Sequence, residues 1–270
     1  MSEVVTSLQN KIVKLAAALK LKKKRDELGL FTTEGIRLAE EALCSEWRIQ
    51  YCLYTGEASS ALRASNLISL LEAKGCKILE VLPHIYEKIS DTDQPQGIML
   101  LIEKHNYKLD ELPYKQFPLC AILDGVQDPG NVGTLIRTAD ATGCDAVLMT
   151  KGCADLFSGK TVRSSMGSIF HLPVYTDLTH YDIVSFLNKN QIKLITTSLD
   201  SSDVYFEADL TGAAAITFGN EGNGVSAEML NSSDCRLHIP IIGKAESLNV
   251  SAAAAVILYE AVRQRRSFVL

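Results

Sequence analysis

The sequence predicts an α/β protein with two successive layered units, because three features point the same way along its 270 residues. Short apolar, β-prone runs alternate with segments of helical periodicity, which is the pattern of a layered α/β fold. A polar stretch at residues 105–117 interrupts this alternation. The hydrophobic content of 47% supplies core for one large or two ordinary domains.

The first unit begins with a helical segment and continues as a small α/β domain. Residues 5–20 place Leu8, Ile12, Leu15 and Leu19 on one stripe, which predicts an amphipathic helix. Strands and helices are then expected to alternate in the order strand 30–33, helix 36–43, strand 48–54, helix 61–74, strand 77–82, helix 84–89 and strand 97–103.

These patterns divide the chain into four parts. Residues 1–27 are expected to form a basic helical arm, residues 28–104 a small α/β domain, residues 105–117 a linker and residues 118–270 a second domain. Within the small domain, the turn-rich loop at 91–97 is of the kind that carries function on a rigid scaffold.

The second unit repeats the alternation with more strands. These are expected at 119–123, 146–149, 174–175, 194–197, 214–218 and 237–241, with helices between them. The final helix is expected to start near Ser247 or Asn249 and to end in a cationic cluster at 263–266, which complements the helix dipole. Alanines at 252–255 give this helix a thin face that can pack closely against the sheet or a partner subunit.

Charge is distributed unevenly along the chain. Residues 1–25 carry a net charge of +6, which leaves −11 for the remainder because the total is −5. A basic arm on an acidic body suits attraction to RNA phosphates, although a solvated helix face would explain it equally well. The cations of the arm, opposed by Glu3, are Lys11, Lys14, Lys20, Lys22, Lys23, Lys24 and Arg25.

Composition disfavours several other classes of protein. No apolar run reaches transmembrane length, and the N-terminus lacks the apolar core of a signal peptide. The seven cysteines occur singly without a C-x-x-C pair, which favours a reducing cytoplasm and burial of most of them as small hydrophobes. The five histidines show no metal-ligand spacing, so no metal site is expected.

Three loops of the second unit combine glycines with short polar side chains, and they span 217–224, 239–243 and 247–251. The first two follow apolar runs, and ligands bind at the carboxyl ends of strands in open α/β sheets because backbone N–H groups converge there. Glycines let the backbone approach a ligand, while Glu221, Ser247 and Asn249 are able to orient it. The three loops together predict a pocket.

A fourth loop follows the apolar run at 119–123 and leads into a helix. The Pro-Gly pair at 129–130 breaks the strand, and Asn131 is a candidate N-cap for the helix. Asn131, Thr134 and Thr138 fall near one face of that helix, with Arg137 beside them. An arginine in this place can reach an anionic group over the loop.

In order, these loops resemble the three motifs of the SpoU/TrmH branch of the SPOUT superfamily, the RNA ribose 2′-O-methyltransferases. The first motif, N-x-G-x-x-x-R, is matched by Asn131, Gly133 and Arg137. The second, G-x-E-x-x-G, is matched by Gly219, Glu221 and Gly224. The third, which ends in S-L-N-V-S, is matched by Ile239, Pro240, Gly243 and residues 247–251. The resemblance spans residues 118–266, and residues 28–103 resemble the small substrate-binding domain that often precedes this one.

The resemblance implies a trefoil-knotted SPOUT-type catalytic domain with a mostly parallel sheet, preceded by a small α/β RNA-binding domain. Knots are nearly absent from proteins, so no periodicity indicates one. It also implies a homodimer that binds S-adenosylmethionine and whose active site borrows residues across the interface. The residues expected to contact the cofactor are Thr197, Gly219, Asn220, Ile239, Leu248 and Asn249.

The implied chemistry is displacement at the sulfonium methyl by a ribose 2′-hydroxyl, which needs aligned reactants and loss of the hydroxyl proton. In the family the arginine matched by Arg137 is proposed as the general base. A guanidinium hardly ever gives up its proton, so we expect Arg137 to clamp a phosphate and steady the 2′-oxyanion. Asn131, Glu221, Ser247 and Asn249 are expected to orient it, with Glu221 as an alternative proton acceptor.

Alternatives remain for the substrate and for one motif. Ribosomal RNA is favoured over transfer RNA because the extra domain offers a separate grip, and a non-catalytic RNA-binding protein of the same fold is the third possibility. Residues 154–161 nearly spell a phosphate-binding P-loop, but Ala154 replaces its first glycine, which disfavours a nucleotide triphosphatase. Four residues beyond it are similar to a family pattern and are candidates for facing RNA or the other subunit: Arg163, Ser165, Gly167 and Ser168.

Overall fold

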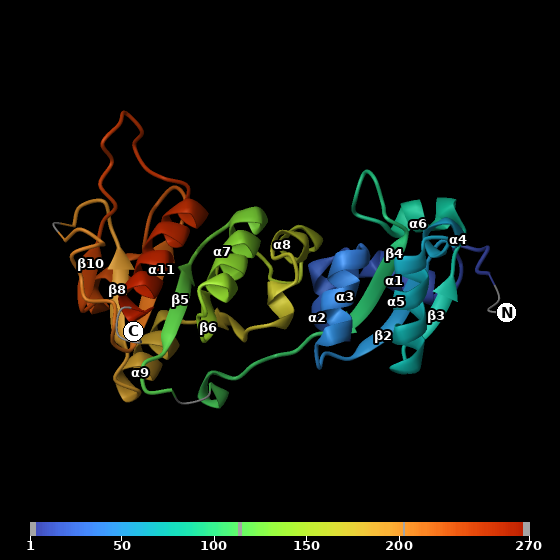
Figure 1. Ribbon diagram of the computed structural model, residues 1–270, viewed down its shortest axis with the longest axis horizontal. Helices are drawn as coiled ribbons and strands as arrows, with labels where there is room; N and C mark the ends of the chain where they lie inside the picture. The colour runs from blue at the N-terminus through green and yellow to red at the C-terminus, as the bar shows by residue number, and fades with distance from the viewer. Residues whose placement is uncertain (1–3, 113–114, 202, 267–270) are drawn as a thin grey trace. The chain divides into compact units, whose positions relative to one another are not determined.

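The computed structural model describes residues 4–112, 115–201 and 203–266, and it divides into two compact units (Figure 1). Unit 1 comprises the chain up to His105 together with Phe157–Phe170, and unit 2 comprises Asn106–Leu156 and the chain from His171 onward. Every helix in the described ranges is too short or too polar to cross a membrane.

Small parts of the expected segments lie outside the described residues. They are residues 1–3 of the arm, which include Glu3, residues 113–114 of the linker, and residues 202 and 267–270 of the second domain.

Unit 1 contains a four-stranded mixed sheet at the expected positions. Its strands are β1 (Leu30–Glu34), β2 (Ile49–Tyr54), β3 (Lys77–Glu80) and β4 (Ile98–Glu103). Their order is β1-β4-β2-β3, with β4 antiparallel to β1 and β2, and with β2 parallel to β3. The helices are α1 (Lys11–Ala18), α2 (Lys22–Leu28), α3 (Ile36–Cys44), α4 (Gly56–Ser59), α5 (Leu62–Ala73), α6 (Pro83–Ile89), α8 (Gly159–Ser164) and the 3₁₀ turn η2 (Ser168–Phe170).

The first helix, α1, is shorter than the helix predicted at residues 5–20. The side chain of Asn10 accepts hydrogen bonds from the backbone nitrogens of Ile12 and Val13, at 2.8 and 3.5 Å, so the helix begins at Lys11. Val13, Ala16 and Leu19 are buried in the core of unit 1 with Ile85 of α6, whereas Ile12 and Leu15 of the predicted stripe are partly buried and Leu8 is 45% exposed. The segment therefore packs as part of a domain core and is not a free arm.

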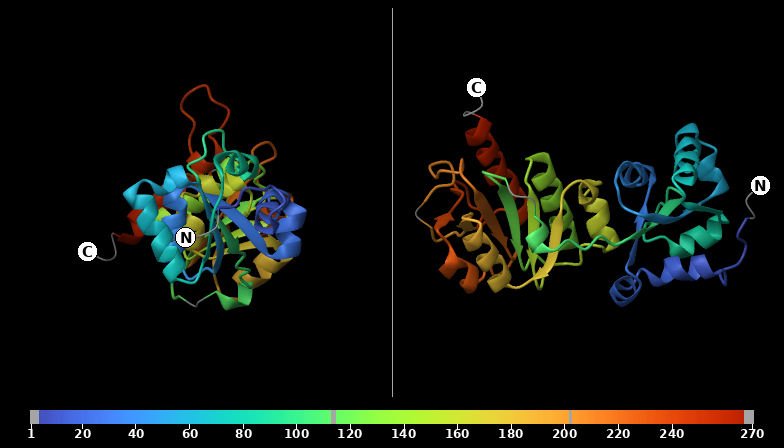
Figure 2. Two further views of the ribbon diagram at one scale, coloured as in Figure 1. Left: turned by 90° about the vertical axis from the view of Figure 1, so that its right-hand side faces the viewer. Right: turned by 90° about the horizontal axis from the view of Figure 1, so that it is seen from below.

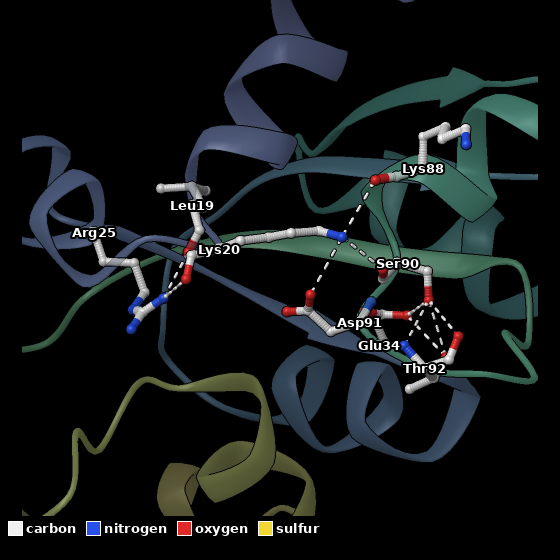
Figure 3. Close-up of polar contacts among 8 residues, drawn as sticks. All are labelled: Leu19, Lys20, Arg25, Glu34, Lys88, Ser90, Asp91 and Thr92. Atoms are coloured by element: carbon white, nitrogen blue, oxygen red, sulfur yellow. Dashed lines mark hydrogen bonds and ion pairs between the residues drawn. The ribbon is translucent and has the colours of Figure 1, made fainter.

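Arg25, counted among the cations of the arm, is buried at 6% exposure. Its Nη1 donates to the carbonyl oxygens of Leu19 and Lys20, at 2.7 and 2.8 Å, where α1 ends (Figure 3). These bonds satisfy carbonyls that a helix end leaves without intrahelical partners. Arg25 thus supports the fold of unit 1 and does not present its charge to solvent.

Lys20 is also bound internally, in a group that we call the Glu34 cluster (Lys20, Glu34, Ser90, Asp91 and Thr92). The Lys20 ammonium donates to the carbonyl oxygen of Ser90 at 2.7 Å and lies 3.3 Å from the carboxylate of Asp91 (Figure 3). The Glu34 carboxylate accepts from Ser90 Oγ at 2.6 Å, from the Asp91 backbone nitrogen at 2.8 Å and from Thr92 Oγ1 at 3.4 Å. The start of the loop at 91–97 is therefore anchored by its own polar groups.

The segment Phe157–Phe170 packs into unit 1, which corrects one expectation. Phe157 lies against Phe31 of β1, with ring centroids 4.9 Å apart. Ser165 is fully buried and Ser168 is 5% exposed, while Gly167 is buried so tightly that an added Cβ would lie 2.5 Å from the side chain of Glu41. Of the four candidates for facing RNA or another subunit, these three face a protein core instead.

Unit 2 contains a six-stranded sheet in which every strand pairing is parallel, which confirms the expected mostly parallel sheet. Its strands are β5 (Leu119–Asp124), β6 (Ala146–Thr150), β7 (Val174–Leu178), β8 (Lys193–Thr197), β9 (Ala214–Gly219) and β10 (Cys235–Leu237). Their order is β10-β8-β9-β5-β6-β7. The strand predicted at 237–241 is thus wrong: β10 ends at Leu237 because its register partner Thr197 is the last residue of β8.

Helices cover both faces of this sheet (Figure 2). On one face lie α7 (Pro129–Ala141) and α11 (Val250–Arg266), which pack against each other. On the other face lie α9 (His180–Lys189) and α10 (Ala227–Ser232). The short 3₁₀ turn η1 (Leu109–Glu111) precedes β5. Buried side chains of α9 and α10, including Ile183, Leu187 and Met229, form one core with Ile122 and Leu148 of the sheet. The sheet is therefore an inner layer between helices, and the ends of its strands, where the loops begin, are left uncovered by helices.

Arg265 fixes the far end of α11. Its guanidinium donates to the carbonyl oxygens of Phe117 at 2.9 Å, Leu210 at 3.0 Å and Gly212 at 2.5 Å. Burial of this group lowers the pKa of Arg265 from its ordinary value. Arg265 thus attaches the end of α11 to the segments that enter β5 and β9. Its positive charge also interacts favourably with the C-terminal end of the helix dipole.

Candidate active site

Two of the predicted loops meet at the carboxyl ends of β5 and β9. Asn220, the first residue after β9, donates from Nδ2 to the carbonyl oxygen of Gly125, the first residue after β5, at 2.8 Å. The backbones of Asn220 and Gly224 also pair with each other at 2.9 Å in both directions. Gly219 has no room for a side chain, because a Cβ there would lie 2.2 Å from the backbone of Gly224. The glycine of the second motif is therefore required by the close return of its own loop.

The helix after β5 is capped by Asp128 and not by Asn131, which corrects the sequence prediction. The Asp128 side chain accepts from the backbone nitrogen of Asn131 at 2.9 Å, and Pro129 takes the first helical position. An aspartate directly before a proline is a recognised helix-start signal, so this cap could have been found from the sequence. With the cap supplied by Asp128, the amide of Asn131 is left to make other contacts.

The amide of Asn131 joins residues from all three motifs. Its Nδ2 donates to Oε1 of Glu221 at 2.9 Å, and its Oδ1 accepts from Nδ2 of Asn249 at 3.0 Å. Asn131 lies 90 residues before Glu221 and 118 residues before Asn249. Three of the four side chains predicted to orient the reactants, all but Ser247, are therefore brought into one hydrogen-bonded chain.

Glu221 is held on the opposite side by backbone donors. Its carboxylate accepts from the backbone nitrogen of Gln127 at 3.2 Å and from that of Asp128 at 3.3 Å. Burial opposes ionisation of this carboxyl, but the bonds from Asn131 and from the backbone outweigh it, so the pKa of Glu221 lies below its ordinary value. The group is a carboxylate at neutral pH and a weaker base than an ordinary glutamate.

Asn249 both caps α11 and contacts the site. Its Oδ1 accepts from the backbone nitrogen of Ser251 at 2.9 Å and from Ser251 Oγ at 2.6 Å, so the helix begins at Val250. Because the oxygen is directed at Ser251, the Nδ2 group is directed at Asn131. The simple capping role and the site role considered for this residue therefore coexist.

Arg137 is exposed on α7, about two turns after the start of the helix. Within the described ranges its guanidinium makes no hydrogen bond or ion pair, and it does not contact the Asn131–Glu221–Asn249 chain. A guanidinium carries five N–H donors in a planar fork. Those of Arg137 remain available for an anionic partner.

The predicted cofactor residues lie in two settings. Gly219 and Asn220 belong to the loop just described, and Thr197 ends β8, where its hydroxyl donates to the carbonyl oxygen of Thr217 at 3.0 Å. Ser247 and Leu248 lie in the long loop between β10 and α11, which projects from unit 2 in Figure 1. The structure does not bond these two residues, or Ile239 of the same loop, to the Asn131–Glu221–Asn249 chain.

This long loop has both unbonded backbone groups and exposed apolar side chains. Among the described residues, 239–248 make no backbone hydrogen bond. Ile242 is 93% exposed and Leu248 is 41% exposed. A segment with unused backbone donors and acceptors and with uncovered apolar side chains is suited to hold a ligand that has both a polar edge and an apolar face.

Family models match both parts of the chain. A model described as the SpoU rRNA Methylase family matches residues 118–259, and a model described as the MRM3-like substrate binding domain matches residues 10–100. The first range includes every motif residue discussed above, and the second includes β1, β2, β3 and the first half of β4.

Characterised relatives and solved structures are similar over nearly the whole chain. The chain is 37% identical to the Bacillus subtilis 23S rRNA (guanosine(2553)-2′-O)-methyltransferase RlmP, over 94% of this chain and 97% of that protein. It is 29% identical to a Streptomyces viridochromogenes 23S rRNA (uridine(2479)-2′-O)-methyltransferase, over 97% and 93% of the two chains. An AdoMet-bound rRNA methyltransferase from Sinorhizobium meliloti superposes with a TM-score of 0.88 at 32% identity, over 97% and 98%.

Proposed function

Because the chain belongs to the SpoU rRNA methylase family, we infer that it transfers the methyl group of S-adenosylmethionine to a ribose 2′-hydroxyl of ribosomal RNA. The observation that carries this inference is the Asn249–Asn131–Glu221 chain, which joins the three motifs at the strand ends of one parallel sheet. The carboxyl ends of such strands are where ligands of open α/β sheets bind.

The residues present fit the cofactor. The adenosyl group of S-adenosylmethionine has a polar edge and apolar faces, and the loop at 239–248 offers free backbone groups together with exposed Ile242 and Leu248. The tight return at Gly219 holds the loop 219–224 close to the end of β9, where Asn220 also bonds to the segment after β5. We assign cofactor binding to Gly219, Asn220, Ile239, Leu248 and Asn249, with Thr197 at the end of the adjacent strand.

The cofactor supplies an activated methyl group, so the protein must place the attacking hydroxyl and stabilise its developing charge. We assign this role to Arg137, whose fork clamps a neighbouring phosphate and the 2′-oxygen. Asn131, Glu221 and Asn249 hold the adjoining loops and orient the sugar, and Ser247 is assigned to the same group. The lowered pKa of Glu221 makes it a weaker base, which favours an orienting role over the role of proton acceptor.

Two chains are proposed to complete the site as a homodimer. Val256 and Tyr259 on α11 are 36% and 53% exposed, and α11 packs on α7, which carries the free Arg137. A second copy covering these helices would bury the apolar side chains and bring Arg137 to a neighbouring site. Tyr259→Glu should then yield monomers in analytical ultracentrifugation together with loss of activity, whereas a wild-type monomer with full activity would exclude this arrangement.

The trefoil knot is part of the same proposal. The C-terminal segment would be threaded so that Asn249 reaches Asn131, as the family resemblance implies. The reducing cytoplasm is proposed as the compartment, because Cys52, Cys76, Cys120 and Cys144 are buried as free thiols and packed as small hydrophobes.

Unit 1 is proposed to hold the RNA. The match to a substrate-binding domain supports this role, as do the exposed cations of residues 1–25 that remain after Lys20 and Arg25 are bound within unit 1 and Lys24 is paired with Glu27 at the surface. They are Lys11, Lys14, Lys22 and Lys23. Ribosomal RNA is preferred to transfer RNA because the Bacillus subtilis relative, which covers both units, is named for 23S rRNA.

The test is to supply the purified chain with methyl-labelled S-adenosylmethionine and with either ribosomal RNA or transfer RNA from cells that lack the protein. Sequence-resolved mapping of 2′-O-methyl groups follows. We expect label at a ribose of ribosomal RNA and calorimetric binding of about one cofactor per chain. Label on transfer RNA alone would reassign the substrate, and binding of ATP without binding of the methyl donor would overturn the proposal.

A further inference from the structure

A buried carboxylate lies directly behind the candidate active site. Asp124, the last residue of β5, is 4% exposed and is the only acidic residue among the buried polar side chains of the described chain. Its Oδ1 accepts from Nε2 of His180 at 2.9 Å and from Oγ1 of Thr150 at 3.1 Å. Its Oδ2 accepts from the backbone nitrogen of Ser226 at 2.8 Å.

Burial opposes the charge of this carboxylate, but its donors stabilise it. Hydrogen bonds from Ser226 and His180, together with the charge that His180 can carry, outweigh desolvation and lower the pKa of Asp124 from its ordinary value. The carboxylate can therefore only accept, and the proton on His180 Nε2 must point to it. Thr150 extends the contact, because its Oγ1 also accepts from the backbone nitrogen of Gly125 at 3.0 Å.

The arrangement is not a nucleophile with its base. Ser226 Oγ lies 3.3 Å from His180 Nε2, the same ring nitrogen that contacts Asp124. A serine–histidine–aspartate relay needs one ring nitrogen for each partner. Ser226 is also engaged as the cap of α10, where it accepts from the backbone nitrogen of Met229 at 3.4 Å. A hydrolytic role is therefore excluded by geometry.

Asp124 instead holds both ends of the loop that carries Glu221. At the start of that loop, the backbone of Asp124 is in register with Gly219, the last residue of β9. At its end, the carboxylate of Asp124 takes the N–H of Ser226. Asp124 also precedes the segment 125–128, whose backbone nitrogens at Gln127 and Asp128 donate to Glu221.

We propose that Asp124, oriented by His180 and Thr150, is a positioning residue that closes the loop 220–225 and thereby sets the place of Glu221 and Asn131 for methyl transfer. The proposal rests on the proposed function of that site. His180 comes from the first turn of α9, so a residue outside all three motifs controls the geometry of two of them. Orienting partners of this kind are commonly as important to activity as the groups they orient.

The experiment compares His180→Ala with His180→Gln in the full chain. Alanine removes the donor to Asp124, whereas glutamine returns an amide N–H on a side chain of similar reach. The matched control is His171→Ala, because His171 makes a comparable contact with Asp140 at 2.8 Å at a site before β7. The single-turnover rate at saturating cofactor and RNA, cofactor affinity and amide hydrogen exchange of residues 219–226 are measured for each variant.

We expect His180→Ala to lower the single-turnover rate about tenfold to a hundredfold at saturating cofactor, as misplacement of reacting groups does. Exchange at Ser226 and in 220–225 should accelerate, His180→Gln should restore most of both properties, and His171→Ala should match the wild type. Unchanged exchange in His180→Ala would overturn the proposal whatever the activity. Equal impairment in the alanine and glutamine variants would overturn it as well, because the donor would then not matter. Absence of methyl transfer by the wild type would refute the proposed function, while the exchange data would still decide whether Asp124 closes the loop.

Discussion

Two polar groups at strand ends, one in each unit, differ in how completely their hydrogen bonds are used. In the Glu34 cluster of unit 1 the carboxylate accepts from three donors, and the Lys20 ammonium is bound by carbonyl oxygens and Asp91. In unit 2 the Glu221 carboxylate is equally well held, but Arg137 and the backbone of 239–248 have no partner within the described ranges. In the Glu34 cluster the polar groups are bonded to one another, whereas in unit 2 Arg137 and the 239–248 backbone keep unused donors.

Whether the hydrogen-bonding groups are already used distinguishes a structural polar cluster from a candidate site better than the types of residue do. The loop at 91–97 contains turn residues and carboxylates, and on sequence grounds it was expected to carry function. The carboxylate that anchors the start of this loop, that of Glu34, has its bonds satisfied by Ser90, Asp91 and Thr92 and has little left to offer a ligand. In unit 2, the unused donors of Arg137 and of the backbone at 239–248 leave binding capacity for a substrate.

The largest test of this contrast is Arg137→Lys. Lysine keeps the charge but loses the planar fork, so we expect methyl transfer to fall by about a hundredfold or more while cofactor affinity is unchanged. Single-turnover methylation and calorimetry measure the two properties. Arg263→Lys serves as the control, since it makes the same exchange at an arginine whose guanidinium is already held by both carboxylate oxygens of Glu260. A nearly normal rate for Arg137→Lys would remove Arg137 from the site and turn attention to Glu221.

A second test exchanges the two carboxylates for amides. Glu221→Gln should reduce turnover by about tenfold, because the amide must present a donor where Asn131 and two backbone nitrogens already donate, which misplaces the orienting group. The melting temperature should change little, because Glu221 is exposed and water can take over the displaced bonds, whereas Glu34 is partly buried. Glu34→Gln should do the reverse and cost about 1–3 kcal/mol of stability with turnover retained. Denaturant titration and turnover are measured in parallel. The contrast fails if both variants lose activity and stability in the same proportion.

Arg25→Met tests whether the N-terminal cations are equivalent. Removing the guanidinium leaves the carbonyl oxygens of Leu19 and Lys20 without their donor. We therefore expect a loss of about 2 kcal/mol in the free energy of unfolding. The salt dependence of RNA binding should not change. A variant of normal stability that binds RNA with a flatter salt dependence would show that Arg25 reaches phosphate after all.

A smaller effect is expected when Lys22 and Lys23 are replaced by glutamine. Both are exposed, so each phosphate contact that is lost should reduce the slope of log affinity against log salt by about 1. Lys24→Gln is the matched control, because Lys24 is paired with Glu27 at 2.7 Å. Equal slopes for the double variant and the wild type would mean that this helix is only a solvated surface.

The smallest expected effect is that of pH on Glu221. Its pKa is lowered from 4.5, so the orienting carboxylate is complete above that value and is lost only as pH falls through the lower folded-state pKa. The rate should therefore show no step from this group between pH 7 and about pH 5. Comparison with the pH profile of Glu221→Gln isolates it. A step in that range, absent from the variant, would restore Glu221 as a proton acceptor.

The sheet of unit 2 and its site loops could be predicted because local patterns specify them. Apolar runs, glycine turns and motif spacing placed Asn131, Glu221 and Asn249 at strand ends, and the fold brings these three together. The strand predicted at 237–241 shares only Leu237 with β10 (Cys235–Leu237), because the position of this strand is set by its pairing with β8, which ends at Thr197. The arm was misjudged because net charge does not tell whether Arg25 faces water or carbonyl oxygens. His180 was missed because its partner lies 56 residues away across the sheet.

The double fixing of α11 has a consequence for the order in which the protein is made. Asn249 ties one end of the helix to Asn131, and Arg265 ties the other to the segments entering β5 and β9. The helix has 17 residues, so these attachments lie about 25 Å apart. During synthesis the sheet can form before α11 has been made. The hydrogen bonds among Asn131, Glu221 and Asn249 cannot be held in place until residue 265 has left the ribosome. The protein is thus expected to remain inactive until α11 has been translated as far as Arg265.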